Sequence, residues 1–257
     1  MDDVRVLTTL DERGVFTISL NDTEKRNVLS QALTTELVAA MDRVDKDPAI
    51  RLVLLTNSGR IFCAGADLDE RRASGGQPGP VDSLALFRRI QLSPKPWIGR
   101  ITGHAVAGGT GLAAALDISV ALTDIKFGFT EVRLGIAPAI MSAICLPKMR
   151  QGDARATFMR GALFDGAEAA RLGLITIAVD SEEALDAEVD AVIDDVLLGG
   201  PEALAATKDL FEKVPAMTPD DAIAWASVRS AELFGSDEAA EGMAAYLEKR
   251  PPNWAQG

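Results

Sequence analysis

Hydrophobic and polar positions recur with two different periods near the start of the chain. Val4–Thr9 and Val15–Leu20 alternate as strands do, with the polar turn Asp11–Gly14 between them, so they predict a β-hairpin. After Ser30 the apolar residues recur three or four positions apart, which predicts a helix that Ser30 caps. The apolar stripe of that helix consists of Leu33, Leu37, Met41 and Val44.

Similar patterns continue along the chain. Further strands are predicted at Arg51–Thr56, Trp97–Thr102, Ile118–Leu122, Ile125–Phe129 and Leu174–Val179. Further helices are predicted at Val81–Gln91, Ile140–Met149, Ala154–Met159, Ala167–Leu172, Glu182–Leu198, Pro201–Val214, Pro219–Phe234 and Asp237–Leu247. A mobile loop is expected at Ala73–Pro80. Strands and helices alternate first and helices alone follow, so we expect an α/β core over residues 1–195 and a helical region over 196–257.

Composition excludes several classes of function. Of the 257 residues 47% are hydrophobic, which is enough for a substantial core, and the formal net charge is -12. An acidic chain is unsuited to nucleic acid or to an anionic membrane surface, and an anionic substrate would need a local basic patch. The two cysteines and the absence of a signal-like start or a long apolar run predict a soluble, cytoplasmic protein.

Two small-residue segments carry the candidate chemistry. Ile61–Leu68 reads as a strand, then the loop Ala64-Gly65-Ala66, then a helix start at Asp67. Gly103–Gly111 has the same character and follows the predicted strand Trp97–Thr102. Loops without bulky side chains leave their backbone N–H groups accessible. Two such donors can converge on one carbonyl oxygen and stabilise it as it becomes an enolate or oxyanion. The glycines are equally compatible with close packing of a strand against a helix.

Glu131 is the best candidate for an acid or base, because it lies in the otherwise apolar stretch Phe127–Pro138. Burial there would raise the pKa of its carboxyl toward the range useful for proton transfer at neutral pH. The alternative is that Glu131 forms an ion pair with Arg133 or Lys126 on a surface turn.

The other reactive residue types point to structural roles. His104 is the only histidine and no Gly-x-Ser-x-Gly segment accompanies it, so a packed, hydrogen-bonded histidine is expected rather than a catalytic one. One histidine and two separate cysteines cannot form a zinc site. Cys63 is expected to be a small core residue, and Asp117 to fix a helix end or a turn.

Five segments together resemble the crotonase family, also called enoyl-CoA hydratase/isomerase. The matching segments are Arg26–Ser30, Phe62–Leu68, Gly103–Leu112, Phe127–Gly135 and Glu241–Asn253. The resemblance covers essentially the whole chain, with the motifs in the family's order and spacing.

The resemblance implies a crotonase-like α/β spiral of repeated ββα units with a C-terminal helical trimerisation region, and therefore a homotrimer or a hexamer. It implies that the N–H groups of Ala66 and Gly108 form the oxyanion hole for an acyl-CoA thioester. Coenzyme A would be part of the substrate, and no separate cofactor is expected. The residues implied in binding it are Lys25, Arg26, Val28, Ala64, Ala66, Asp67, Leu68, Gly108 and Gly111, and Lys249 or Arg250 of a neighbouring subunit is a further candidate for the phosphates. The acyl chain would meet Leu68–Pro80 and Ile136–Ile144.

One position departs from the family's pattern. Typical hydratases of the family hold the attacking water between two glutamates, and Gly111 occupies the position of the first while Glu131 matches the second. Thr110 can hydrogen-bond a water but cannot act as a base at neutral pH. One carboxylate is enough to shuttle a proton along an enoyl chain, as in the family's isomerases. The sequence therefore favours isomerisation over hydration; a non-catalytic acyl-CoA binder, or another reaction such as thioester hydrolysis, stays open.

Overall fold

Two β-sheets organise the protein, whose computed structural model describes residues 4–77 and 83–255. The first sheet has the strand order β1-β2-β3-β5-β7-β10 and the second has the order β4-β6-β8-β9. The strands of the first sheet are β1 (Val6–Leu10), β2 (Val15–Leu20), β3 (Leu52–Asn57), β5 (Trp97–Ile101), β7 (Ile118–Leu122) and β10 (Ile177–Val179). Those of the second are β4 (Ile61–Cys63), β6 (His104–Val106), β8 (Lys126–Gly128) and β9 (Phe164–Asp165).

Helices connect the strands and then end the chain. They are α1 (Gln31–Lys46), α2 (Leu68–Ala73), α3 (Ser83–Leu92), α4 (Gly108–Ala115), α5 (Ala139–Cys145), α6 (Gln151–Arg160), α7 (Gly166–Arg171), α8 (Glu182–Leu197), α9 (Pro201–Lys213), α10 (Pro219–Phe234) and α11 (Asp237–Glu248). A short 3-10 helix, η1 (Glu131–Leu134), follows β8, and a second, η2 (Leu146–Lys148), follows α5.

The strands repeat a single unit. Each of the pairs β3–β4, β5–β6 and β7–β8 places its first strand in the first sheet and its second strand in the second sheet. Within each sheet these successive strands pair in parallel, while β1 pairs with β2 and β9 with β8 in antiparallel fashion. Helical segments follow each pair, so the chain advances as stacked ββα units. The predicted α/β spiral is confirmed.

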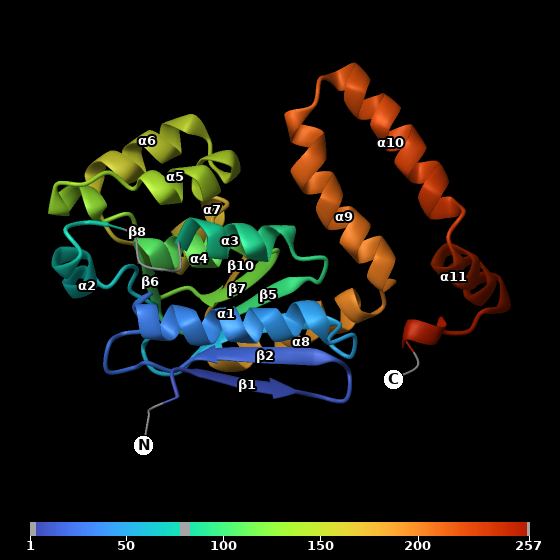
Figure 1. Cartoon of the computed structure of the whole chain (residues 1–257), viewed down its shortest axis with the longest axis horizontal. Helices are drawn as coiled ribbons and strands as arrows, with labels where there is room; N and C mark the ends of the chain where they lie inside the picture. The colour runs from blue at the N-terminus through green and yellow to red at the C-terminus, as the bar shows by residue number, and fades with distance from the viewer. Residues whose placement is uncertain (1–3, 78–82, 256–257) are drawn as a thin grey trace.

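The core lies on both faces of the first sheet. On one face α1 buries the predicted stripe, including Leu33 and Leu37, within the larger hydrophobic cluster. On the other face α8 packs Leu185, Val189 and Ile193 against the sheet. Figure 1 shows α9 and α10 standing beside this body as a long hairpin, with α11 near the C-terminus. No helix within the described residues is long and apolar enough to cross a membrane.

Most predicted elements are confirmed, with shifted ends. The backbone N–H of Leu33 donates to Oγ of Ser30 over 3.2 Å, so Ser30 caps α1 as expected. The predicted helix Ile140–Met149 is wrong in its second half: α5 ends at Cys145 and the tighter η2 follows, because Pro147 has no N–H to continue an α-helix. The predicted strand Leu174–Val179 shortens to β10. The expected mobile loop Ala73–Pro80 lies partly in residues 78–80, outside the described residues.

Candidate functional site

A cavity of about 960 Å³ lies where the loops after β2, β4, β6 and β8 meet. Nine of the ten site residues predicted from the sequence line it; the exception is Gly111. The nine are Lys25, Arg26, Val28, Ala64, Ala66, Asp67, Leu68, Gly108 and Glu131. Residues that are far apart in the chain therefore share one cavity, and the two small-residue segments both reach it.

The loop after β4 is held beside the loop after β2 by backbone hydrogen bonds. The N–H of Leu29 donates to O of Gly65 over 2.7 Å, and the N–H of Ala64 donates to O of Arg26 over 3.2 Å. Asn27, which is fully buried, donates from Nδ2 to O of Ile61 over 2.7 Å and so fixes the same junction from within. These contacts place the backbone of Ala64 to Asp67 along one wall of the cavity.

Ala66 and Gly108, whose N–H groups are the predicted oxyanion donors, both line the cavity. Among the described residues, neither N–H donates a recorded hydrogen bond. Gly108 is the first residue of α4, where the backbone N–H has no partner within the helix. The two loops touch closely: a Cβ placed on Gly65 would lie 2.9 Å from N of Gly108. The two donors thus lie on adjacent, tightly packed loops.

Glu131 begins η1 and is one of the residues that line the cavity. The residue is only 9% exposed, and its Oε2 has no hydrogen-bond partner within the described part of the chain. No ion pair with Arg133 or Lys126 is formed there, which rules out the surface-turn interpretation. Desolvation by burial raises the pKa of the Glu131 carboxyl above its usual value, against a smaller opposing effect of its own backbone amide. A carboxylate with a raised pKa accepts a proton more readily than an ordinary glutamate does.

Gly111 and Thr110 of α4 are not among the residues that line the cavity. Gly111 is buried within α4, and the space where its side chain would extend is filled by Met141 of α5. The hydroxyl of Thr110, also buried, donates to O of Ala105 over 2.7 Å and accepts from the N–H of Gly128 over 3.2 Å. The expectation that Thr110 can hold a water is therefore wrong, because its hydroxyl already joins β6 to β8.

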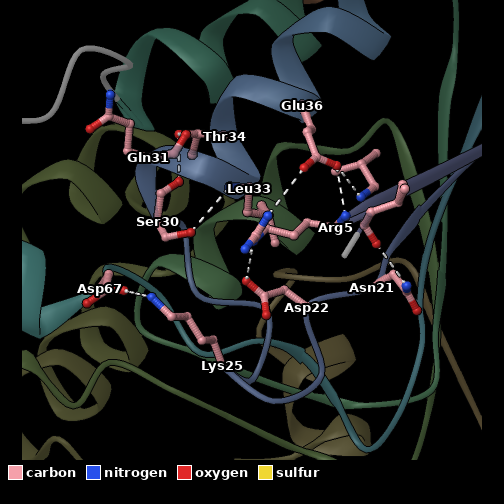
Figure 2. A network of polar contacts seen from close by, with 12 residues as sticks. Arg5, Asn21, Asp22, Lys25, Ser30, Gln31, Leu33, Thr34, Glu36 and Asp67 are labelled. Carbon is pink, nitrogen blue, oxygen red and sulfur yellow. Dashed lines mark hydrogen bonds and ion pairs between the residues drawn. The ribbon is translucent and has the colours of Figure 1, made fainter. Parts of the chain in front are cut away.

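The mouth of the cavity carries an ion pair. Nζ of Lys25 lies 3.4 Å from Oδ2 of Asp67. Figure 2 shows these two side chains pointing toward each other. The Oδ1 of Asp67 accepts from the N–H groups of Asp69 and Glu70 and so caps α2. Burial opposes the shift, but the hydrogen bonds from Glu70 and Lys25 lower the pKa of the Asp67 carboxyl below its usual value. Asp67 is thus a helix cap that also orients Lys25.

The remaining candidates have the structural roles expected of them. Nδ1 of His104 accepts from the N–H of Lys126 over 3.0 Å and links β6 to β8. Cys63 is fully buried, and desolvation raises the pKa of its thiol to about 12. Asp117 accepts from the N–H of Trp97 over 2.7 Å at the turn between α4 and β7. Lys249 and Arg250 do not line the cavity of this chain.

Sequence reasoning did not single out Arg71 as a lining residue. Arg71 of α2 adds a third cation to the cavity, and its Nη1 donates to O of Gln77 over 3.1 Å. It lies in segment 68–80, which was expected to border the acyl chain, but nothing in the local pattern distinguished it from its neighbours. In segment 136–144, Ala139, Met141 and Ala143 suggest an apolar wall or plain packing from the sequence, and Ala139 and Met141 line the cavity.

A second cavity, of about 410 Å³, lies among α9, α10 and α11. Its carboxylates are engaged in holding the fold: Glu238 accepts from the N–H groups of Glu202 and Ala203 at the start of α9. It contains no unpartnered acid comparable to Glu131 within the described residues. The larger cavity is therefore the stronger candidate for a functional site.

Comparison with known proteins gives a consistent picture. The family model described as "Enoyl-CoA hydratase/isomerase" matches residues 11–257. The crystal structure of an enoyl-CoA hydratase from Mycobacterium smegmatis has a TM-score of 0.90 and 31% identity, covering 98% of this chain and 99% of that one. A structure of an enoyl-CoA hydratase from Mycobacterium avium is 40% identical with a TM-score of 0.73, covering 98% and 99%. The Mycobacterium tuberculosis enoyl-CoA hydratase EchA19 is 32% identical over 256 residues, covering 95% of each chain.

Proposed function

Because the chain belongs to the enoyl-CoA hydratase/isomerase family, we propose that it binds an enoyl-CoA thioester in the larger cavity and transfers a proton with Glu131. The observation that carries this proposal is the buried Glu131 carboxylate, whose Oε2 has no partner, beside two loops with unused amides. Coenzyme A enters as part of the substrate, with Lys25 and Arg26 at the cavity mouth as the candidates for its phosphates.

The amides of Ala66 and Gly108 would act on the thioester oxygen. Removal of a proton next to a thioester drives an electron pair onto that oxygen, so donors placed there stabilise the enolate more than the ground state. Loss of one such donor costs about 2.7–4 kcal/mol in characterised enzymes. The rigid contact between Gly65 and Gly108 supports this role, because preorganised donors need no rearrangement during the reaction.

The proton would move through Glu131. In a 3-enoyl thioester the carboxylate takes a proton from C2, and the C–H electron pair passes into the dienolate held by the amides. The same carboxyl then returns the proton to C4, and the double bond shifts to lie between C2 and C3. Nothing is added or lost, and one carboxylate serves both halves of the step. This single-acid arrangement favours isomerisation.

Hydration is the second candidate, and the names of the similar proteins favour it. Water addition to a 2-enoyl thioester places OH on C3 and H on C2, so one group must accept a proton from water while C2 receives one. Glu131 would have to perform both steps. Product identity separates the two reactions, because hydration adds the mass of water and isomerisation leaves the mass unchanged.

The test is to offer 2-enoyl- and 3-enoyl-CoA of several lengths to the wild type and to Glu131→Gln, and to identify products by mass. We expect Glu131→Gln to lower kcat/KM by about 10²–10⁴-fold, because the amide keeps the shape but cannot accept the proton. Glu12→Gln, in the exposed turn before β2, is the matched control and should keep full activity. Full turnover of Glu131→Gln would refute the role of Glu131. Tight binding of CoA thioesters without any turnover would instead indicate a non-catalytic binder.

Assembly is a further part of the proposal. The C-terminal helices expose large apolar side chains, including Phe211 (72%), Phe234 (70%) and Tyr246 (84%). Such surface is characteristic of protein–protein contact. We propose that α9, α10 and α11 mediate a homotrimer, or a hexamer of paired trimers, which the mass of the native protein in solution tests.

A further inference from the structure

The side chain of Met141 fills the space into which a side chain at position 111 would extend. Gly111 lies in α4 and Met141 in α5, and both are buried. A Cβ built on Gly111 would fall 2.2 Å from Sδ and 3.0 Å from Cε of Met141, and 3.4 Å from Cε2 of Phe87. Real Cβ atoms do not approach other atoms so closely. A side chain at position 111 and the present position of the Met141 thioether therefore exclude each other.

Met141 also faces the cavity that contains Glu131. It lines that cavity together with Ala137, Pro138, Ala139 and Ile140, so this part of the wall is apolar. Cys145 lies one turn further along α5, on the same face as Met141. Desolvation by burial raises the pKa of the Cys145 thiol to about 12, while Lys148 lowers it and Glu131 raises it to a smaller extent. Met141 and Glu131 line the same cavity.

We propose that Met141 is a specificity-determining residue that keeps water out of the reaction beside Glu131. This inference rests on the proposed proton transfer by Glu131. The thioether fills the space that a side chain at position 111 would otherwise take, so the wall between α4 and α5 presents sulfur and methyl groups rather than a hydrogen-bonding group. Proton transfer then proceeds along the acyl chain without addition of water.

The physical argument concerns how a water is held. An ordered water in a protein interior needs two to four polar partners. At this wall Thr110 has its hydroxyl bound to Ala105 and Gly128, and the N–H of Gly111 donates within the α4 turn to O of Ala107 over 3.3 Å. Thr110 is the polar side chain of α4 and is already used, so α4 supplies no side-chain partner that would hold a water against Glu131.

The decisive experiment compares Met141→Ala with Met141→Leu, scoring hydrated against isomerised product by mass. Met141→Ala opens the space beside Gly111, and we expect it to raise the hydrated-to-isomerised ratio by about tenfold or more. Met141→Leu keeps an apolar group of similar volume and should stay within about twofold of the wild type. A hydrated product already dominant in the wild type, or an unchanged ratio in Met141→Ala, overturns the inference.

Thermal unfolding tests separately whether Gly111 and Met141 share space, because Met141→Ala could change the product ratio for another reason. Gly111→Ala should lower the Tm of the wild type by roughly 2–4 °C or more, because the new methyl group meets Met141. In the Met141→Ala background the same substitution should leave the Tm unchanged or raise it, and should return the product ratio toward the wild-type value. Equal Tm losses in both backgrounds would show that the two residues do not share space. Failure of the proposed function is seen separately, as retained turnover in Glu131→Gln.

Discussion

Two carboxylates, both with raised pKa values, illustrate how differently this molecule treats its acids. Glu131, in the larger cavity, has a raised pKa and an Oε2 without a partner. Asp117, at the junction between the sheet and α9, also has a raised pKa because of desolvation, but Lys208 opposes that shift. Its Oδ2 accepts from the N–H of Trp97 over 2.7 Å and lies 2.5 Å from Nζ of Lys208.

At this junction Lys208 has hydrogen-bond partners as well as Asp117. Lys208 is 8% exposed, and its Nζ also donates to O of Ile90 over 3.1 Å and to O of Lys95 over 3.2 Å. The ammonium thus uses all three of its donors. Desolvation lowers the pKa of Lys208, and Asp117 counteracts this. The carboxylate of Asp117, paired with Lys208, anchors α9 to the core, whereas Oε2 of Glu131 has no partner within the described residues, which costs stability. Changes at the junction should therefore affect folding, and changes at the cavity should affect turnover.

The largest effect on stability is expected from Asp117→Asn. This variant keeps the shape at Trp97 but removes the counter-charge of the buried Lys208, and we expect a loss of about 2–4 kcal/mol in the free energy of unfolding. That is below the loss for a fully enclosed pair, because the side chain of Asp117 is 26% exposed. Urea unfolding measures it, and kcat of the folded enzyme should be unchanged.

Asp117→Asn combined with Lys208→Met is the control for that prediction. The double variant removes both charges, so most of the lost stability should return. Lys208→Met alone is measured as well. If the loss of stability in the double variant equals the sum of the losses in the two single variants, the two residues do not act as a pair.

Gly65→Ala tests whether the Gly108 amide takes part in turnover. Gly65 has φ +87°, and its new Cβ would press on the N of Gly108, so we expect kcat to fall by about 10²–10³-fold as that amide is displaced. Gly75→Ala is the matched control, because Gly75 also has a positive φ (+64°) but no atom within 4 Å. Both variants carry a backbone penalty of about 1–2 kcal/mol. Equal activity in the two would argue against the placement of the Gly108 amide at the thioester.

The raised pKa of Glu131 should affect the pH dependence of both activity and stability. As a base, Glu131 must be ionised, so kcat/KM should fall as pH drops through its raised pKa, at higher pH than for an ordinary glutamate. For stability, the folded pKa lies above the unfolded one. The contribution of Glu131 is then present below the unfolded pKa and lost as pH rises through the folded pKa.

Glu131→Gln removes that titration. The free energy of unfolding of the variant should therefore exceed that of the wild type by an amount that grows as pH rises, to on the order of 1 kcal/mol. Unfolding curves from about pH 4 to pH 8 measure the difference. A difference that shrinks with rising pH would mean that the Glu131 carboxylate is stabilised, not destabilised, in the folded protein.

The smallest effect is expected at the exposed ion pair of the mouth. The side chain of Lys25 is 56% exposed, so its pair with Asp67 contributes little to folding. Lys25→Gln should raise KM for an enoyl-CoA roughly two- to fivefold, and added salt should reduce the difference. The matching pantetheine thioester, which lacks the nucleotide phosphates, should show no change. Equal effects on both substrates would place Lys25 away from the phosphates.

The sequence by itself determined the elements and most of the cavity. Periodicity located the strands and helices. The two small-residue loops and Glu131 stood out as local features, and the family resemblance supplied the remaining lining residues, such as Lys25 and Arg26. Element ends were less certain where a proline or a short strand decided them, as at Pro147 and β10.

Only the tertiary structure decided which groups are left unpaired and which are paired. The partners of Asp117 and Thr110, and the absence of one for Oε2 of Glu131, depend on contacts between residues far apart in the chain. The same holds for Gly111, whose missing side chain is compensated by Met141 from another helix. Hydrogen bonding and volume filling are properties of neighbours in space, and a one-dimensional pattern does not specify which residues those neighbours are.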